Sequence, residues 1–307
     1  EVETQERDQH LSTFKFRTYA PKKFRKLREL FGVDTYGGDG SDSRLHQAMA
    51  QYKTGSFTGG ASGSFMYYSG DKRFIVKQIT ESEKEVMLEI LDAYLVHMED
   101  SRDSDDKVQS LLLRVVQLNR MQMYSHQVGG CTLMRGRLYF MVFENIFWAP
   151  LMEDVRLMQM EPQYEGMGEQ DLLDIASRDD LEVYDLKGSW VGRSTAADAN
   201  GRRGDTKGKT MKDNDLQEPM YLSDEDQEQL SSQIEKDSAF LQRHDIMDYS
   251  LLLGVRKGIS EVQTSAEAEP EPEQATEDAL IYHAAAAHHS QRYYVSLARL
   301  GACCRRS

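Results

Sequence analysis

The sequence predicts an α+β fold built on antiparallel sheets, with room for one large domain or two lobes around a cleft. The chain has 307 residues, 39% of them hydrophobic, which is enough to bury a sizeable core. Residues 62–69 alternate in polarity and residues 73–79 form an apolar run, and Gly70-Asp71 between them indicates a tight hairpin turn. Residues 82–98 carry apolar side chains at the spacing of an amphipathic helix.

The other elements follow from the same two periodicities. A helix is expected to start at Pro21, because proline suits the first turn, and a second helix is expected over 43–52. Ser223, followed by Asp226, opens a helix over 223–244 in a capping pattern. Core positions are expected at Phe24, Leu27, Leu30, Phe31, Leu230, Ile234, Ala239 and Leu241; strands at 111–124, 131–135, 137–147, 182–193 and 292–297; and loops at 99–107 and 195–215.

Charge and composition exclude several classes of protein. The net charge of −14 argues against a nucleic-acid partner for the chain as a whole. The sequence contains no run of 18 apolar residues, so no transmembrane helix is expected. The charged N-terminus lacks the apolar segment of a secretory signal. Cys131, Cys303 and Cys304 offer neither a disulfide framework nor metal-ligand spacing, so a reducing, cytoplasmic compartment is expected.

Basic residues gather near the N-terminus, although the chain is acidic. Between Phe14 and Phe31 there are seven Lys or Arg residues and one acid, Glu29. They form either a solvated helix face or a patch that meets an anionic membrane, and the residues alone leave both open. Residues 1–13 are polar and expected to be disordered, as is the acidic, low-complexity segment 258–291.

A glycine-rich loop, a strand lysine and a helix glutamate together suggest a nucleotide clamp. Gly60 and Gly63 leave backbone N–H groups free to face phosphate oxygens. Lys77 lies inside the apolar run and needs an anionic partner, either ATP phosphates or a glutamate of the next helix, for which Glu85 is the expected candidate. A glycine-rich loop, a strand lysine and a helix glutamate in this order are typical of a kinase-type nucleotide site. The sequence contains no Walker A motif, so the site is not that of a P-loop protein. The alternative is a strand lysine whose ammonium reaches solvent.

Five stretches occur in an order that resembles the phosphatidylinositol phosphate kinases. They are GGASGSFMYYSGDKRFIVKQI, YFMVFENIF, YDLKGS, TMKDND and HDIMDYSLLLGV, and FRTYAPKKFRKLRELFGVD is similar to the N-terminal segment of that family. YDLKGS and MDYSLL are the most specific, because general protein kinases lack them. The resemblance implies a two-lobed, protein-kinase-like fold with ATP between the lobes and an incomplete C-terminal part. The implied domains are a catalytic core over 14–257, with an N-lobe at 14–147 and a C-lobe at 148–257, and a residual strand with an atypical terminus over 292–307.

The same resemblance implies roles for individual residues. Asp248 stands where the family has its catalytic-loop aspartate, which accepts the proton of the acceptor hydroxyl. Lys77 would contact the ATP phosphates, Lys187 would place a cation near them, and Glu85 would support Lys77. The phosphate-covering loop would be Gly60, Ser62, Gly63 and Ser64, and the backbone of Val142, Phe143, Glu144 and Asn145 would meet adenine. Simpler interpretations are a chain turn at Asp248, a local ion pair at Lys187 and a charged turn at 212–215.

Two departures from the family pattern leave the activity of this chain open. Ala61 replaces a lysine of the glycine loop, and no Asp or Glu occurs after Asp278. The aspartate that the family uses for Mg²⁺ is therefore not found, and the metal ligands are unknown. The expected function is ATP- and Mg²⁺-dependent phosphorylation of a phosphatidylinositol monophosphate at the cytosolic face of membranes. The alternative is an inactive or truncated membrane-binding scaffold; a soluble kinase ranks third, and a homodimer is left open.

Overall fold

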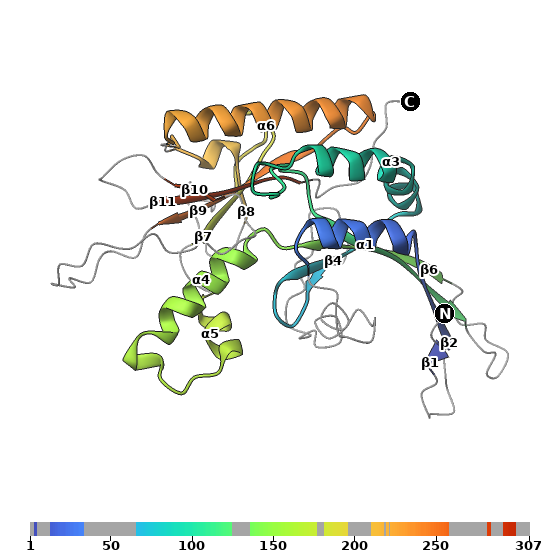
Figure 1. The fold of residues 1–307 in the computed structure, drawn as a ribbon, viewed down its shortest axis with the longest axis horizontal. Coiled ribbons are helices and arrows are strands. Elements are labelled where there is room, and N and C mark those ends of the chain that lie inside the picture. The colour runs from blue at the N-terminus through green and yellow to red at the C-terminus, as the bar shows by residue number, and fades with distance from the viewer. Residues whose placement is uncertain are drawn as a thin grey trace. The chain divides into compact units, whose positions relative to one another are not determined.

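In the computed structural model the chain forms two compact units, whose elements are labelled in Figure 1. The first unit contains Glu1–Arg102 and Arg114–Asn145, and the second contains Asp103–Leu113 and Ile146–Arg299. The structure describes residues 3–4, 13–33, 66–124, 136–176, 181–195, 210–217, 219–220, 222–257, 281–283 and 291–298.

An antiparallel six-stranded sheet forms the centre of the first unit, in the order β1-β2-β5-β6-β4-β3. Strands β3 and β4 form the predicted hairpin around Gly70-Asp71, and Ser69 N–H donates to Phe74 O at 2.9 Å. The strands are β1 (Glu3–Thr4), β2 (Thr13–Thr18), β3 (Met66–Tyr68), β4 (Phe74–Ile79), β5 (Val115–Tyr124) and β6 (Gly136–Glu144). The predicted α+β class with antiparallel sheets is thus confirmed for this unit.

Helix α1 (Pro21–Leu30) begins at the predicted proline and packs on β5 and on helix α3. Phe24, Leu27 and Phe31 of its predicted stripe are buried, whereas Leu30 is half-buried. Arg28 is buried as well and donates to the carbonyl oxygen of Val116 at 3.0 Å. Arg28 therefore belongs to the interior rather than to the basic face of the helix.

Helix α3 (Glu81–Asp100) has the predicted amphipathic stripe and packs on β6. All six apolar residues expected to face the core are buried: Met87, Ile90, Leu91, Tyr94, Leu95 and Met98. Thr80 caps the helix and Glu83 completes a capping box, which fixes where the helix starts. The helix ends at Asp100, so the predicted acidic loop over 99–107 begins two residues late.

A five-stranded sheet forms the centre of the second unit, in the order β10-β11-β9-β7-β8. Its pairs are antiparallel except for β7 and β8, which run parallel. The strands are β7 (Leu181–Leu186), β8 (Thr210–Lys212), β9 (Ser250–Lys257), β10 (Ile281–His283) and β11 (Gln291–Ala298). Strand β11 corresponds to the strand expected in RYYVSL.

Three helices accompany this second sheet. Helix α6 (Asp224–Arg243) starts at the predicted cap, where Ser223 accepts a hydrogen bond from Asp226 N–H. Its stripe differs from the prediction, because Ala239 is exposed and the polar residues Gln233 and Asp237 are buried. Helices α4 (Trp148–Gln159) and α5 (Glu169–Ala176) were not predicted, although they pack through apolar residues at helical spacing: Leu151, Val155, Leu172, Leu173 and Ala176.

Several other expectations need correction or fall outside the described ranges. Strand β1 lies within residues expected to be disordered and pairs with β2, and strand β10 lies within the segment 258–291 and pairs with β11. The predicted loop 195–215 contains β8 and the short 3₁₀ helix η2 (Asp213–Asp215). A second 3₁₀ helix, η1 (Pro162–Tyr164), follows α4. The helix predicted over 43–52 and the strand over 131–135 lie outside the described residues.

Candidate active site

The loop that follows β7 is anchored by a carboxylate from a distant part of the chain. Asp213 Oδ1 accepts hydrogen bonds from the backbone N–H groups of Lys187 and Gly188, both at 2.8 Å. Gly188 has a φ of +70°, a left-handed conformation that glycine adopts without strain and that turns the chain here. Because β8 pairs with β7 in parallel, Asp213 reaches the end of β7 directly. The backbone of Lys187 is thus held in place.

Arg193 completes this anchor from the far end of the same loop. Its Nε donates to Asp213 Oδ2 at 2.7 Å, and its guanidinium also donates to the carbonyl oxygen of Asp185. Burial would raise the pKa of Asp213, but the hydrogen bonds from Arg193, Lys187 and Gly188 outweigh it and hold that pKa below its usual value. Asp213 is therefore a charged structural acceptor, and not the solvated charged turn of the simpler interpretation.

The side chain of Lys187 points to Asp248. Its ammonium donates a hydrogen bond to Asp248 Oδ1, although the two residues stand 61 positions apart. Asp248 has a φ of +60° and directly precedes the turn into β9, and its side chain remains 55% exposed. Aspartate adopts this left-handed conformation more readily than most non-glycine residues, so the backbone turns here without a glycine. YDLKGS, MKDND and MDYSLL, which lie far apart in the sequence, therefore meet at one place.

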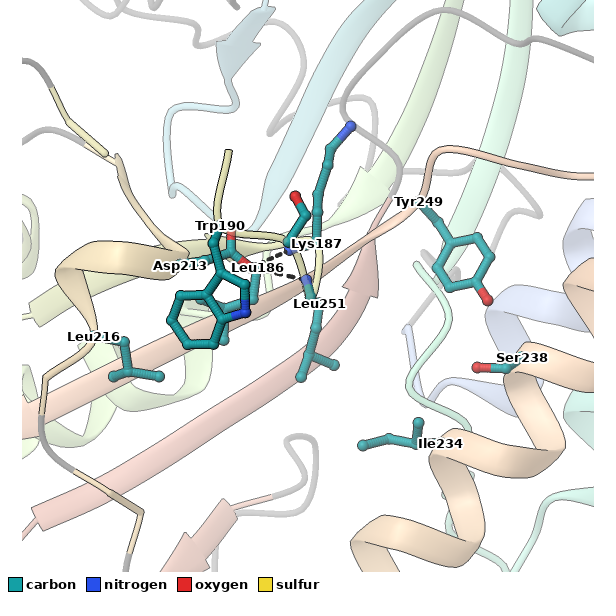
Figure 2. A pocket seen from close by; sticks show the side chains of 11 residues that line it. Leu186, Lys187, Trp190, Asp213, Leu216, Ile234, Ser238, Tyr249 and Leu251 are labelled. Carbon is teal, nitrogen blue, oxygen red and sulfur yellow. Dashed lines mark hydrogen bonds between the residues drawn. The ribbon is translucent and has the colours of Figure 1, made fainter. Parts of the chain in front are cut away.

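A pocket of about 470 Å³ opens beside Lys187 (Figure 2). Its walls come from the ends of β7 and β9, from η2 and from α6. Most of the lining surface is apolar, and polar side chains are contributed by Lys187, Ser189, Asp213, Ser238 and Tyr249. The residues that line it are Leu186, Lys187, Gly188, Ser189, Trp190, Asp213, Leu216, Ile234, Ser238, Tyr249 and Leu251. These walls suit an apolar group better than a cluster of phosphates.

The strand lysine of the first unit is buried against a glutamate. Lys77, on β4, is 5% exposed, and its ammonium lies 3.5 Å from Glu83 Oε1. Glu85, the expected partner, instead lies 3.4 Å from Lys84 and is largely exposed. The assignment of Glu85 is thus wrong, and Glu83 takes its place. The signal was present in the sequence: Thr80 and Glu83 have capping-box spacing, which turns the glutamate back toward the start of the helix.

The family model for phosphatidylinositol-4-phosphate 5-kinase matches residues 49–165 and 167–296. The chain belongs to the phosphatidylinositol phosphate kinase family. A probable phosphatidylinositol phosphate kinase of Dictyostelium discoideum is 30% identical over 245 residues, which cover 79% of this chain and 28% of that protein. Phosphatidylinositol 4-phosphate 5-kinase 9 of Arabidopsis thaliana is 29% identical over 249 residues, 80% of this chain and 24% of that protein.

A mammalian member of the family matches over a similar length. Phosphatidylinositol 4-phosphate 5-kinase type-1 beta of Homo sapiens is 27% identical over 250 residues, 80% of this chain and 36% of that protein. The chain thus spans roughly a quarter to a third of the length of these relatives. None of the helices within the described ranges is long and apolar enough to cross a membrane.

The four residues expected to meet adenine in this family form the end of a central strand. Val142, Phe143 and Glu144 belong to β6, which pairs with β4 on one side and β5 on the other. Glu144 N–H donates to Arg114 O at 3.0 Å, and Asn145 N–H donates to Arg73 O at 2.7 Å. These two N–H groups are therefore bonded within the protein, and the contact of this backbone with adenine stays a prediction.

The glycine loop and the metal site complete the list of expected family features. Gly60, Ser62, Gly63 and Ser64 lie outside the described residues. Within the described ranges, no group of three or more His, Cys, Asp or Glu side chains is placed to hold a metal ion.

The sequence did not predict that Asp213 and Arg193 anchor the loop after β7. The parallel pairing of β7 with β8, which brings them there, is a long-range feature without a local sequence signal.

Proposed function

We propose that the chain is the catalytic part of a lipid kinase that transfers the γ-phosphate of ATP to an inositol hydroxyl of a phosphatidylinositol monophosphate. The observation that carries the proposal is the hydrogen bond from the Lys187 ammonium to the Asp248 carboxylate. This bond brings together the Lys187 ammonium, which suits phosphate oxygens, and the Asp248 carboxylate, which can accept a hydroxyl proton. The loop that carries Lys187 is anchored by Asp213. Family membership supports the same class of reaction.

Asp248 acts as the proton acceptor in this proposal. A bond forms between the inositol oxygen and the γ-phosphorus, and the bond from that phosphorus to the β,γ-bridging oxygen breaks, releasing ADP. The hydroxyl proton passes to the carboxylate of Asp248. At 55% exposure, this carboxylate is open to a hydroxyl from outside the protein.

The two lysines bind phosphate oxygens in this proposal. Lys187 exchanges its hydrogen bond with Asp248 for one to a phosphate oxygen, which frees the carboxylate for the substrate. Lys77 is held by Glu83, whose other carboxylate oxygen accepts from Thr80 N–H at 2.7 Å. Since a buried ammonium needs anionic partners, Lys77 can bind a phosphate while Glu83 keeps it in position.

Mg²⁺ enters the proposal only as the usual companion of ATP. It takes oxygen ligands, mostly from phosphates and water, together with one or two carboxylates. The described residues contain no group of three or more candidate ligands, and Asp213 is already committed to Arg193 and two N–H groups. No protein ligand is therefore assigned to the metal, and no step depends on one.

Radiolabelled ATP with vesicles that contain each phosphatidylinositol monophosphate tests the proposal. Label should appear in a bisphosphate lipid, and Asp248→Asn should lower kcat at least about 100-fold, because asparagine cannot accept the proton. Asparagine also tolerates the left-handed backbone, so the loop should keep its shape. Asp245→Asn is the matched control, since Asp245 is also exposed and has a φ of +55°. Absence of any lipid product would contradict the proposed activity.

A non-catalytic membrane-binding regulator is the second candidate function, and the basic face of α1 favours it. Lys22, Arg25 and Lys26 are exposed on this helix, whereas Lys23 bonds to Asp92 at 2.6 Å. Such a face is attracted to anionic lipids at the cytosolic surface of a membrane. Vesicle co-sedimentation that survives Lys77→Met and Asp248→Asn, in a chain without turnover, would favour this function over the kinase.

A further inference from the structure

Two large apolar residues stand exposed at the tip of the loop after β7. Trp190 is 76% exposed and its neighbour Val191 is 94% exposed. Gly188 and Gly192 flank this tip, and both have a φ of +70°. A Cβ atom added to either glycine would meet nothing within 4 Å, so the chain bends through open space on both sides. The tip is therefore largely open to solvent, although Trp190 also lines the pocket beside Lys187.

Hydrogen bonds at the base of the loop hold the tip in this position. The side-chain amide of Asn214 donates to Trp190 O at 2.9 Å and to Ser194 Oγ at 3.0 Å. Arg193 is bound to Asp213 on the other side of the tip. The entropy of ordering the loop is thus already lost on folding, which lowers the cost of presenting the tip to a binding surface.

The side chains of the tip suit the boundary between lipid headgroups and acyl chains. Tryptophan concentrates at this boundary, because its ring is apolar while its N–H bonds to headgroups or water. Valine carries no polar atom and gains free energy on leaving water. An exposed apolar pair on a fixed loop is unfavourable in water and requires an explanation.

The sequence that follows this loop is basic, which favours an anionic membrane over a neutral surface. Residues 196–209 contain four basic residues, Arg202, Arg203, Lys207 and Lys209, against two acids, Asp198 and Asp205. The nearby carboxylate of Asp215 is occupied by Thr195 and by Lys212 N–H. In a chain of net charge −14, this excess of positive charge along the sequence complements anionic lipids.

We propose that Trp190 and Val191 insert into the headgroup–acyl boundary of an anionic membrane and so set the depth of the catalytic loop. The inference rests on the proposed lipid kinase activity for its purpose. Lys187 is three residues from Trp190, a span of at most about 11 Å. The headgroup layer of one leaflet is about 5–8 Å thick. Insertion of the tip therefore brings Lys187 and its partner Asp248 to the level of the inositol ring while the lipid stays in the membrane.

Tryptophan fluorescence tests the insertion directly, because the chain has two tryptophans. In Trp148→Phe, Trp190 is the remaining indole. Vesicles of phosphatidylcholine and phosphatidylserine should shift its emission to shorter wavelength, and brominated acyl chains should quench it. If Trp148→Phe fails to fold, the difference in quenching between the unaltered chain and Trp190→Phe measures the same quantity. Emission that bound vesicles neither shift nor quench would overturn the proposal, as would a shift caused by self-association without lipid.

Substitution of the exposed valine provides a second test. Val191→Asp should weaken vesicle binding at least about ten-fold, because a charge replaces an inserted apolar group. Val96→Asp is the matched control, since Val96 is an exposed valine (53%) on α3 of the first unit. Equal effects of the two substitutions, or no effect of either, would contradict the proposal.

A comparison of substrates separates this proposal from the proposed activity. Val191→Asp should lower turnover of monophosphate lipid in vesicles relative to turnover of a short-chain, water-soluble monophosphate lipid. If no substrate is phosphorylated, the kinase proposal fails, and fluorescence quenching still decides the insertion. If both substrates are turned over in an unchanged ratio, the kinase proposal stands and the depth-setting role of the tip is wrong.

Discussion

Asp237 accepts a hydrogen bond from the Ser110 hydroxyl at 2.9 Å, across 127 positions of the chain. Gln233 donates to the same oxygen at 3.0 Å, and the second oxygen accepts from Leu111 N–H at 2.7 Å. The Asp237 side chain is fully buried on α6. One carboxylate thus ties residues 110–111 to α6 within the second unit.

Asp237→Asn should destabilise the protein by about 2–3 kcal/mol. The amide nitrogen of asparagine would face a hydrogen-bond donor, either Ser110 or Leu111, and leave it unsatisfied in the interior. Urea denaturation followed by circular dichroism measures the change in the free energy of unfolding. Glu228→Gln, at an exposed position of the same helix, should change it by less than about 0.5 kcal/mol. Equal effects of the two substitutions would refute the assigned role of Asp237.

Gly254→Ala should destabilise the second unit by about 1–3 kcal/mol through overpacking. A Cβ at this position of β9 would overlap Cε1 of Phe147 and lie 3.3 Å from Cδ1 of Leu181. Gly168→Ala is the control, because its Cβ would meet an ordinary contact at 3.6 Å. Thermal melts of both variants check the prediction, and Phe147→Leu should partly rescue Gly254→Ala. A fully stable Gly254→Ala protein would show that the Phe147 ring does not pack there.

The Asp213–Arg193 pair predicts a specific dependence of stability on pH. The folded-state pKa of Asp213 is lowered, against the effect of burial, by Arg193 and by two backbone N–H groups. A carboxylate whose pKa is lowered on folding stabilises the folded state at pH values above its unfolded-state pKa, which is about 3.9 for aspartate. This stabilisation is lost as the pH falls through the folded-state pKa. The stability difference between the unaltered chain and Asp213→Asn should therefore be constant from about pH 5 to 7 and shrink below about pH 4. Urea titrations at several pH values measure it, and a difference that grows toward low pH would contradict the assignment.

The two neighbouring glutamates of α3 should differ in their effect on ATP use. Glu83→Gln keeps a capping-box residue but removes the charge that faces Lys77, so kcat/KM for ATP should fall at least about ten-fold. Glu85→Gln should leave it nearly unchanged, because Glu85 faces Lys84 and solvent. The rise in melting temperature caused by ATP gives a readout that does not require turnover. A larger loss from Glu85→Gln would restore the original assignment.

Much of the fold was predictable because periodic apolar patterns report burial locally. The stripes of α1 and α3 and the β3–β4 hairpin follow from spacing and turn residues alone. The polar stripe of α6 was not predictable in this way, because Asp237 bonds to Ser110, 127 positions away, and Gln233 in turn bonds to Asp237. Helices α4 and α5 were missed even though their apolar spacing is a usable signal.

Some members of the candidate site stand out in the sequence, but their arrangement does not. Lys77, Lys187 and Asp248 stand out because a charge inside or beside an apolar strand needs a partner. The sequence does not show which carboxylate pairs with each lysine. Glu83 can pair with Lys77 because of its position in the first turn of α3, and Asp248 can pair with Lys187 because the backbone at Asp248 is left-handed. The role of Asp213 depends on strand pairing across 26 positions, which no local pattern encodes.

The carboxylate of Asp215 receives hydrogen bonds from Thr195 on one side and Lys212 N–H on the other. Asp215 therefore joins Thr195 and Lys212, the described residues on either side of this part of the sequence. Changes in the length or charge of residues 196–209 should leave Lys187 in place, because these hydrogen bonds remain and a longer connection adds only a small entropic penalty. Affinity tags or fluorescent reporters inserted there should be tolerated for the same reason.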